Sequence, residues 1–141
     1  MSLDDIYRET ILDHNQVPRN KGKLERPTAT VGLLNPTCGD QIRLDLEVAN
    51  GKVTDVRFDG QGCAISMASA SMMTEAIKGR SVNDALALAR AFKAFLTGQP
   101  PEVDLGELEA LEGVSQFPSR VKCATLAHNA LEKALNAEHP D

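Results

Sequence analysis

Residues 41–58, QIRLDLEVANGKVTDVRF, carry the pattern that decides the fold. From Gln41 to Val48 polar and apolar side chains alternate strictly, which is typical of a strand with one face on the core and one in water. Asn50-Gly51 then supplies the residue pair that tolerates positive φ in a two-residue turn, and residues 53–58 return antiparallel. The stretch therefore predicts a β-hairpin.

A further strand is predicted before the hairpin. Residues 29–34 form a short apolar run that Asn35-Pro36 stops, and Thr37-Cys38-Gly39-Asp40 follows as a turn. The three strands together indicate an antiparallel meander.

The rest of the chain carries helical periodicity. The sequence predicts a helix that ends near Asn15, one that opens at Cys63 and stops before Gly79, one over residues 82–96, and a last one capped by Ser119. A short acidic helix with a three-residue apolar repeat, between residues 102 and 112, is expected on the surface. We expect an α+β fold, a small three-stranded antiparallel sheet with about five helices packed mainly on one face, in one domain of residues 1–141.

Composition narrows the function classes. The 141 residues include 20 acidic and 15 basic side chains, and the resulting net charge of -5 disfavours nucleic-acid binding, which needs clustered Lys and Arg. No segment resembles a signal peptide or a membrane span, so no membrane partner is expected. Three cysteines, an odd number, without a secretory signal fit a reducing cytoplasm, which is the expected location.

The cysteines and one aspartate are candidates for a metal site. Cys38 and Asp40 stand two residues apart at the start of the second strand, so their side chains project to the same side. Cys63 follows the third strand, which returns to the same end of the sheet. If the last helix docks its amino end there, Cys123 completes a set of three thiolates and one carboxylate, which zinc accepts.

Packing is the competing explanation for each of these thiols. Free cysteine is among the most buried residue types, and a single one is as readily explained by packing as by chemistry. No CxxC pair is present, and the cysteines are 25 and 60 residues apart, so their spacing alone carries little information. The helix amino terminus at Cys63, and the charges of Arg120 and Lys122 beside Cys123, favour reactive thiolates.

The histidines His14 and His128, and a polar cluster around His14, are not assigned to a site. His14 is expected to pack or cap the end of its helix, and His128 is expected to face solvent. The polar residues Asp13, Pro18, Arg19 and Asn20, with His14, show no visible acid–base partner and are interpreted as a solvated connection.

Several short motifs extend over almost the whole chain: Asp13-His14, Pro18-Arg19-Asn20, Asn35-Pro36 before Cys38-Gly39-Asp40, Gly60-Gln61-Gly62-Cys63-Ala64-Ile65-Ser66, and Arg120-Val121-Lys122-Cys123. Together they resemble the IscU/NifU-like iron-sulfur cluster assembly superfamily, specifically its zinc-dependent SufU branch. IscU proteins have a His before the third cysteine, where this chain has Lys122, so the resemblance gives the fourth ligand position to Asp40. The acidic segment before Phe117 resembles the insertion that distinguishes SufU from IscU.

The resemblance implies a zinc-dependent sulfur acceptor, or sulfurtransferase, that takes persulfide sulfur from a cysteine desulfurase of the SufS/IscS type. It implies Cys38 as the acceptor, with Asp40, Cys63 and Cys123 keeping the zinc and Arg120 stabilising the anionic sulfur. A downstream iron-sulfur scaffold or apoproteins would receive the sulfur. The alternatives are a scaffold that assembles a [2Fe-2S] cluster on the same four ligands, and a small protein in which zinc only holds the fold.

Overall fold

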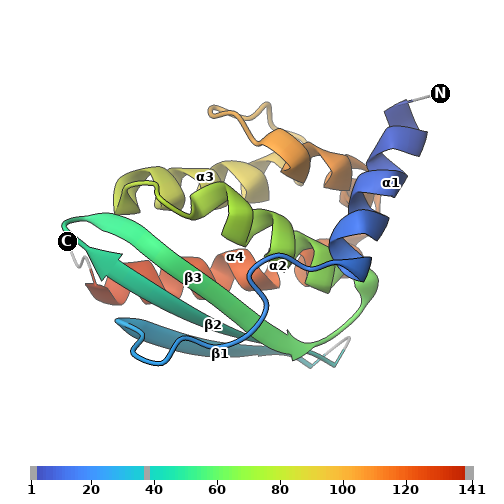
Figure 1. Ribbon diagram of the computed structural model, residues 1–141. Helices are drawn as coiled ribbons and strands as arrows, with labels where there is room; N and C mark the ends of the chain where they lie inside the picture. Colours follow the sequence, from blue (N-terminus) through green and yellow to red (C-terminus); the bar gives the residue numbers. More distant parts are fainter. Residues whose placement is uncertain (1–2, 37–38, 139–141) are drawn as a thin grey trace.

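The computed structural model describes residues 3–36 and 39–138. Three strands are followed by a run of helices, as Figure 1 shows. Along the chain the elements are α1 (Leu3–Gln16), β1 (Ala29–Asn35), β2 (Asp40–Ala49), β3 (Lys52–Gln61), α2 (Ala64–Ile77), α3 (Val82–Phe95), the 3-10 helix η1 (Gly106–Gln116) and α4 (Pro118–Glu138). The predicted α+β class, with a three-stranded antiparallel sheet and five helices, is confirmed.

The sheet has the order β1-β2-β3, and both pairs are antiparallel. The predicted hairpin turn is confirmed, because Asn50 and Gly51 have φ values of 54° and 74°. β3 continues to Gln61, beyond the predicted end at Phe58. Gly60 explains the difference: it pairs with Ile42 at φ 152°, where a Cβ would lie 2.0 Å from the carbonyl oxygen of Gln41. Only glycine keeps the strand paired there.

The helices form two layers over the sheet. α4 lies on β1 and β2, while α2 and α3 contact β3. α1 packs on α2 and η1, farther from the sheet (Figure 1). The interior is aliphatic, with Phe58 and Phe92 as its largest fully buried side chains. α4 begins at Pro118, one residue before the predicted cap Ser119, because proline suits the first helical position, where no N–H bond is needed.

The opposite face of the sheet is partly covered by the connection between α1 and β1, which crosses in front of β3 in Figure 1. Asp45 points to this face yet is only 1% exposed. Its carboxylate accepts hydrogen bonds from the backbone N–H of Leu24, the hydroxyl of Thr30 and the guanidinium of Arg43. One residue of the predicted wet face is therefore a buried anchor for the connection.

The acidic segment is less exposed than predicted. η1 turns its apolar residues Leu108, Leu111 and Val114 into the protein, and all three are buried. Three residues per turn is the period of a 3-10 helix, so side chains three apart share one face. The three-residue repeat thus fits a 3-10 helix, whereas the surface placement holds for acidic side chains such as Glu102, Asp104, Glu107 and Glu112.

His128 is buried, and the prediction that it faces solvent is wrong. Its ring stacks on Phe92 with centroids 4.2 Å apart, and Nε2 lies 3.1 Å from the hydroxyl of Ser69. α4 packs on β1, β2, α2, α3 and η1, so a polar residue outside its apolar stripe is buried as well. Within the described part of the chain, no helix is long and apolar enough to cross a bilayer.

We expect His128 to make the fold acid-sensitive. Burial, and secondarily the charge of Lys93, lower the pKa of His128 from 6.5 to about 3. The unfolded chain therefore binds a proton here at a higher pH than the folded one, and stability falls as pH drops below about 6.5. The expected loss is about 2 kcal/mol between pH 8 and pH 5. Lys93 is itself paired with Glu132.

Urea unfolding of the metal-free protein across this pH range measures the effect. The control is His128→Gln, which has no imidazole at this position and should show a shallower pH dependence. NMR of the wild-type imidazole provides a second measurement: its resonances should not titrate above pH 4. Equal pH slopes for the two proteins, together with an imidazole that titrates near pH 6.5, would contradict the expectation.

Candidate metal centre

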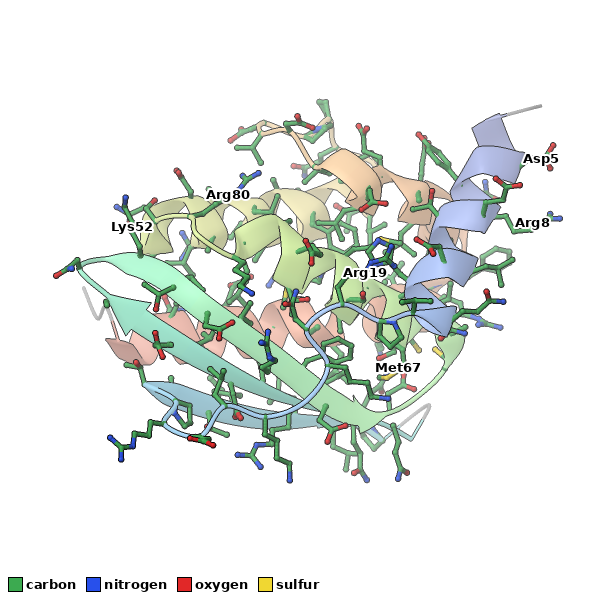
Figure 2. All side chains as sticks on the ribbon, viewed as in Figure 1. Asp5, Arg8, Arg19, Lys52, Met67 and Arg80 are labelled. Carbon is green, nitrogen blue, oxygen red and sulfur yellow. The ribbon has the colours of Figure 1, made fainter. Side chains whose placement is uncertain are left out.

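Asp40, Cys63 and Cys123 converge at one end of the molecule. One ligand atom from each lies within 4.8 Å of those of the other two, although the residues come from β2, the start of α2 and α4. Met67, one turn after Cys63, is labelled in Figure 2 at this end, where β3 leads into α2. The site therefore connects the sheet with the second and the last α-helix of the sheet-and-helix domain, α2 and α4.

The strand register explains why Asp40 and Cys63 meet. Asn35 pairs with Asp40, and Gln41 pairs with Gln61, so the start of β2 and the end of β3 share one edge of the sheet. Two residues beyond Gln61, the backbone N–H of Cys63 donates to Asp40 Oδ1 at 2.9 Å. The Sγ of Cys63 lies 4.0 Å from Asp40 Oδ2. The carboxylate is 1% exposed, so this bond fixes a charge inside the protein.

Cys63 is the N-cap residue of α2. Its backbone is extended, at φ -70° and ψ 167°, and its Sγ accepts a hydrogen bond from the Ser66 N–H at 3.4 Å. A cap position places the sulfur at the positive end of the helix dipole, where a thiolate is favoured. The predicted placement of this thiol at a helix start is confirmed.

Cys123 is the sixth residue of α4 and is only 2% exposed. Its Sγ lies 3.5 Å from the carbonyl oxygen of Ser119 and 4.0 Å from the side-chain nitrogen of Asn35. Because α4 lies along β1, its first turns approach the end of β1, where Asn35 stands. The amino end of the last helix therefore docks at the predicted rim.

Gly62 makes room for the carboxylate. A Cβ at this position would lie 2.6 Å from Asp40 Oδ1 and 3.1 Å from the carboxyl carbon. Contacts below 3.0 Å force a shift, and the buried Asp40 has a hydrogen bond to lose. A side chain at position 62 would therefore compete with Asp40 for its place in the cluster.

The donor set fits zinc. Bond lengths of about 2.0–2.3 Å to oxygen and sulfur place the ligand atoms of a tetrahedral zinc site about 3.5–3.8 Å apart. The observed separations of up to 4.8 Å need a closure of about 1 Å, which side-chain rotation supplies. Two thiols and a carboxylate occupy three positions of such a site.

The structure brings together three of the predicted ligands and does not test the fourth. Cys38, the predicted acceptor and fourth ligand, lies outside the described residues. Arg120 lies in the first turn of α4, exposed, and lines an apolar pocket of about 360 Å³ with Ile11, Ile65 and Phe117 among others. Ile65 follows Cys63 by two residues and Arg120 precedes Cys123 by three, but neither cysteine is among the residues that line this pocket.

The interpretation of the polar residues around His14 as a solvated connection is wrong. His14 is 1% exposed, with Nδ1 2.8 Å from the Ser71 hydroxyl and Nε2 3.1 Å from Glu107. The Arg19 backbone N–H also donates to Ser71, and the Arg19 side chain, labelled in Figure 2, pairs with Asp13. These residues fasten α1 and η1 to α2.

The sequence analysis does not assign Asn35, which contacts Cys123, to the site. The motif Asn35-Pro36 before Cys38 is the sequence signal that could have indicated it.

Comparison with known proteins identifies the family. Residues 6–137 match the model of the NifU-like N-terminal domain. Over 139 residues the chain is 50% identical to the zinc-dependent sulfurtransferase SufU of Bacillus subtilis, covering 97% of this chain and 94% of that protein. It is 46% identical over 143 residues to the iron-sulfur cluster assembly scaffold protein IscU of Streptococcus pyogenes, covering 97% and 89%.

A solved structure supports the same assignment. It belongs to a candidate iron-sulfur cluster assembly scaffold of the SUF system of Fervidobacterium islandicum, and matches with a TM-score of 0.87 at 32% identity, covering 95% of this chain and 99% of that one. The chain therefore belongs to the NifU-like N-terminal domain family, which includes the SufU and IscU proteins of iron-sulfur cluster assembly. The resemblance noted in the sequence is confirmed.

We expect Gly62→Ala to weaken zinc binding about tenfold or more, because the added methyl group displaces the Asp40 carboxylate. Competition with a chromogenic chelator measures the affinity. The control is Gly113→Ala, whose added Cβ meets no atom within 4 Å and should leave zinc affinity unchanged. If Gly62→Ala bound zinc as tightly as the control, the Asp40 carboxylate would not be a zinc ligand.

Proposed function

We propose that this protein is a zinc-dependent sulfurtransferase that accepts persulfide sulfur from a cysteine desulfurase for iron-sulfur cluster assembly. The observation that carries the proposal is the convergence of Asp40, Cys63 and Cys123, which supplies three donors of the kind zinc prefers. The 50% identity with a protein named as a zinc-dependent sulfurtransferase supports it. Cys38 is proposed as the fourth ligand and as the acceptor.

The proposed reaction is a thiol–persulfide exchange. The thiolate of Cys38 attacks the terminal sulfur of the persulfide on the desulfurase. A new S–S bond forms on Cys38, the S–S bond on the desulfurase breaks, and the desulfurase cysteine leaves as a thiolate. No external oxidant or reductant is needed, because the sulfane sulfur keeps its oxidation state.

The protein's own residues have separate roles in this proposal. Asp40, Cys63 and Cys123 hold zinc, which when bound keeps the acceptor sulfur as a thiolate without redox chemistry of its own. Asp40 accepts a hydrogen bond from the Cys63 N–H, and the Cys63 sulfur accepts one from the Ser66 N–H. Both side chains are therefore oriented before metal binds. Arg120, exposed in the first turn of α4, is proposed to supply a guanidinium for the anionic sulfur.

The remaining parts of the proposal concern context. The partners are a cysteine desulfurase of the SufS/IscS type and, for onward transfer, an iron-sulfur scaffold or apoproteins. The chain acts as one domain of residues 1–141, in the cytoplasm. Since no CxxC pair is present and the described thiols are 60 residues apart, the site depends on the folded domain.

A scaffold function is the second candidate, because a relative 46% identical over nearly the whole chain is named an IscU scaffold. The same donors would then hold a [2Fe-2S] cluster. Anaerobic reconstitution distinguishes the two candidates. A stable cluster that passes intact to an apoprotein favours the scaffold, whereas zinc-dependent stimulation of cysteine turnover by the desulfurase favours sulfur transfer.

We expect Cys38→Ala to abolish persulfide formation on this protein. Mass spectrometry of each cysteine peptide, after mixing with desulfurase and free cysteine, shows where the sulfur goes. In the wild type the added sulfur should be on Cys38. Persulfide that still forms on the Cys38→Ala protein, at Cys63 or Cys123, would show that the acceptor is assigned wrongly.

We expect Arg120→Ala to slow persulfide transfer about tenfold while zinc content stays at the wild-type level, since a hydrogen bond to a charged group contributes about 1.5 kcal/mol or more. Lys122→Ala removes an equally exposed positive charge from the same helix and is the matched control. Single-turnover transfer rates compare the two. An equal slowing in both variants would indicate general attraction of the partner rather than a role of Arg120 at the sulfur.

A further inference from the structure

Asn35 connects two parts of the cluster that are far apart in sequence. It is the last residue of β1 and pairs with Asp40, the first residue of β2, in the sheet register. Its carbonyl oxygen accepts the Gly39 N–H at 2.8 Å, which closes the β1–β2 turn next to Asp40. Its side-chain Nδ2 lies 4.0 Å from Cys123 Sγ. One residue therefore touches both the turn beside the carboxylate and the thiol of α4.

Burial makes this contact informative. Asn35 is 6% exposed, and buried amide groups cost free energy unless they are hydrogen-bonded. Its Nδ2 lies within hydrogen-bond range of Cys123 Sγ, a sulfur that also lies 3.5 Å from the carbonyl oxygen of Ser119.

The two cysteines and the aspartate of the cluster also differ in their surroundings. Cys63 receives a backbone N–H at its helix cap, and Asp40 receives the Cys63 N–H. Cys123 lies deeper, in the second turn of α4, beyond the first N–H groups of that helix. The side chain of Asn35 supplies for Cys123 the kind of donor that the backbone supplies for the other two.

We propose that Asn35 is a positioning residue of the metal centre, whose side-chain N–H contacts and orients Cys123. This inference rests on the proposed metal-holding role of Asp40, Cys63 and Cys123. Groups that hydrogen-bond to metal ligands orient them and tune the metal, and their loss commonly weakens metal binding about 10- to 100-fold.

Two variants test the role. Asn35→Asp keeps the shape of the side chain but replaces the N–H donor by a second acceptor, and Asn35→Leu removes the donor without adding charge. Both should lower zinc affinity, measured by chelator competition, about 10- to 100-fold. Asn20→Asp is the matched control, because Asn20 bonds Thr74 and Glu75 away from the thiols. It should bind zinc like the wild type.

A spectroscopic measurement separates positioning from a structural contribution. In the cobalt-substituted proteins the thiolate-to-cobalt charge-transfer bands should shift or weaken in both Asn35 variants and stay unchanged in Asn20→Asp. These bands report the thiolate–cobalt bonds directly, so the comparison does not depend on the thermal stability of the metal-free proteins. Zinc affinity and cobalt spectra of both Asn35 variants equal to the wild type would overturn the role of Asn35 alone. A wild type that fails to hold zinc would overturn both this inference and the proposed function.

Discussion

The antiparallel register of β2 is the constraint on which the rest of this structure depends. It places the start of β2 beside both the end of β1 and the end of β3, so three backbone segments meet at one edge. A shift by one residue would turn Ile42 and Leu44 from the core to the outer face, and Asp40 away from Cys63. The same hydrophobic alternation that stabilises the fold therefore also fixes the geometry of the candidate metal centre.

The helices bring the two cysteines to this edge of the sheet, which the strands have already formed. Cys63 caps α2 because β3 ends two residues earlier, and Gly62 leaves room for Asp40 in the short connection. α4 brings Cys123 to the edge because it lies along β1 and β2. The bonds of His14 with Ser71 and Glu107 hold α1 and η1 against α2, the helix that Cys63 caps.

The sequence indicates those features that depend on local pattern or strand geometry. The hairpin follows from alternation and Asn50-Gly51, and the approach of Asp40 to Cys63 follows because antiparallel neighbours share edges. His14 was expected to pack, and it does, but its partners are 57 and 93 residues away and no local pattern shows them. His128 was misplaced for a related reason: an apolar stripe marks one face of a helix, whereas α4 is enclosed on several.

Electrostatics favours a cation over simple packing as the reason for the cluster. If Asp40, Cys63 and Cys123 held a metal as anionic ligands, like charges within 4.8 Å in a buried site would repel strongly. The surrounding groups are arranged to receive negative charge: N–H donors from Cys63, Ser66 and the side chain of Asn35 point at these atoms. Such donors would offset part of this repulsion, and a bound divalent cation would offset the rest. Cysteines kept only for packing need neither a buried carboxylate between them nor a glycine that makes space for it.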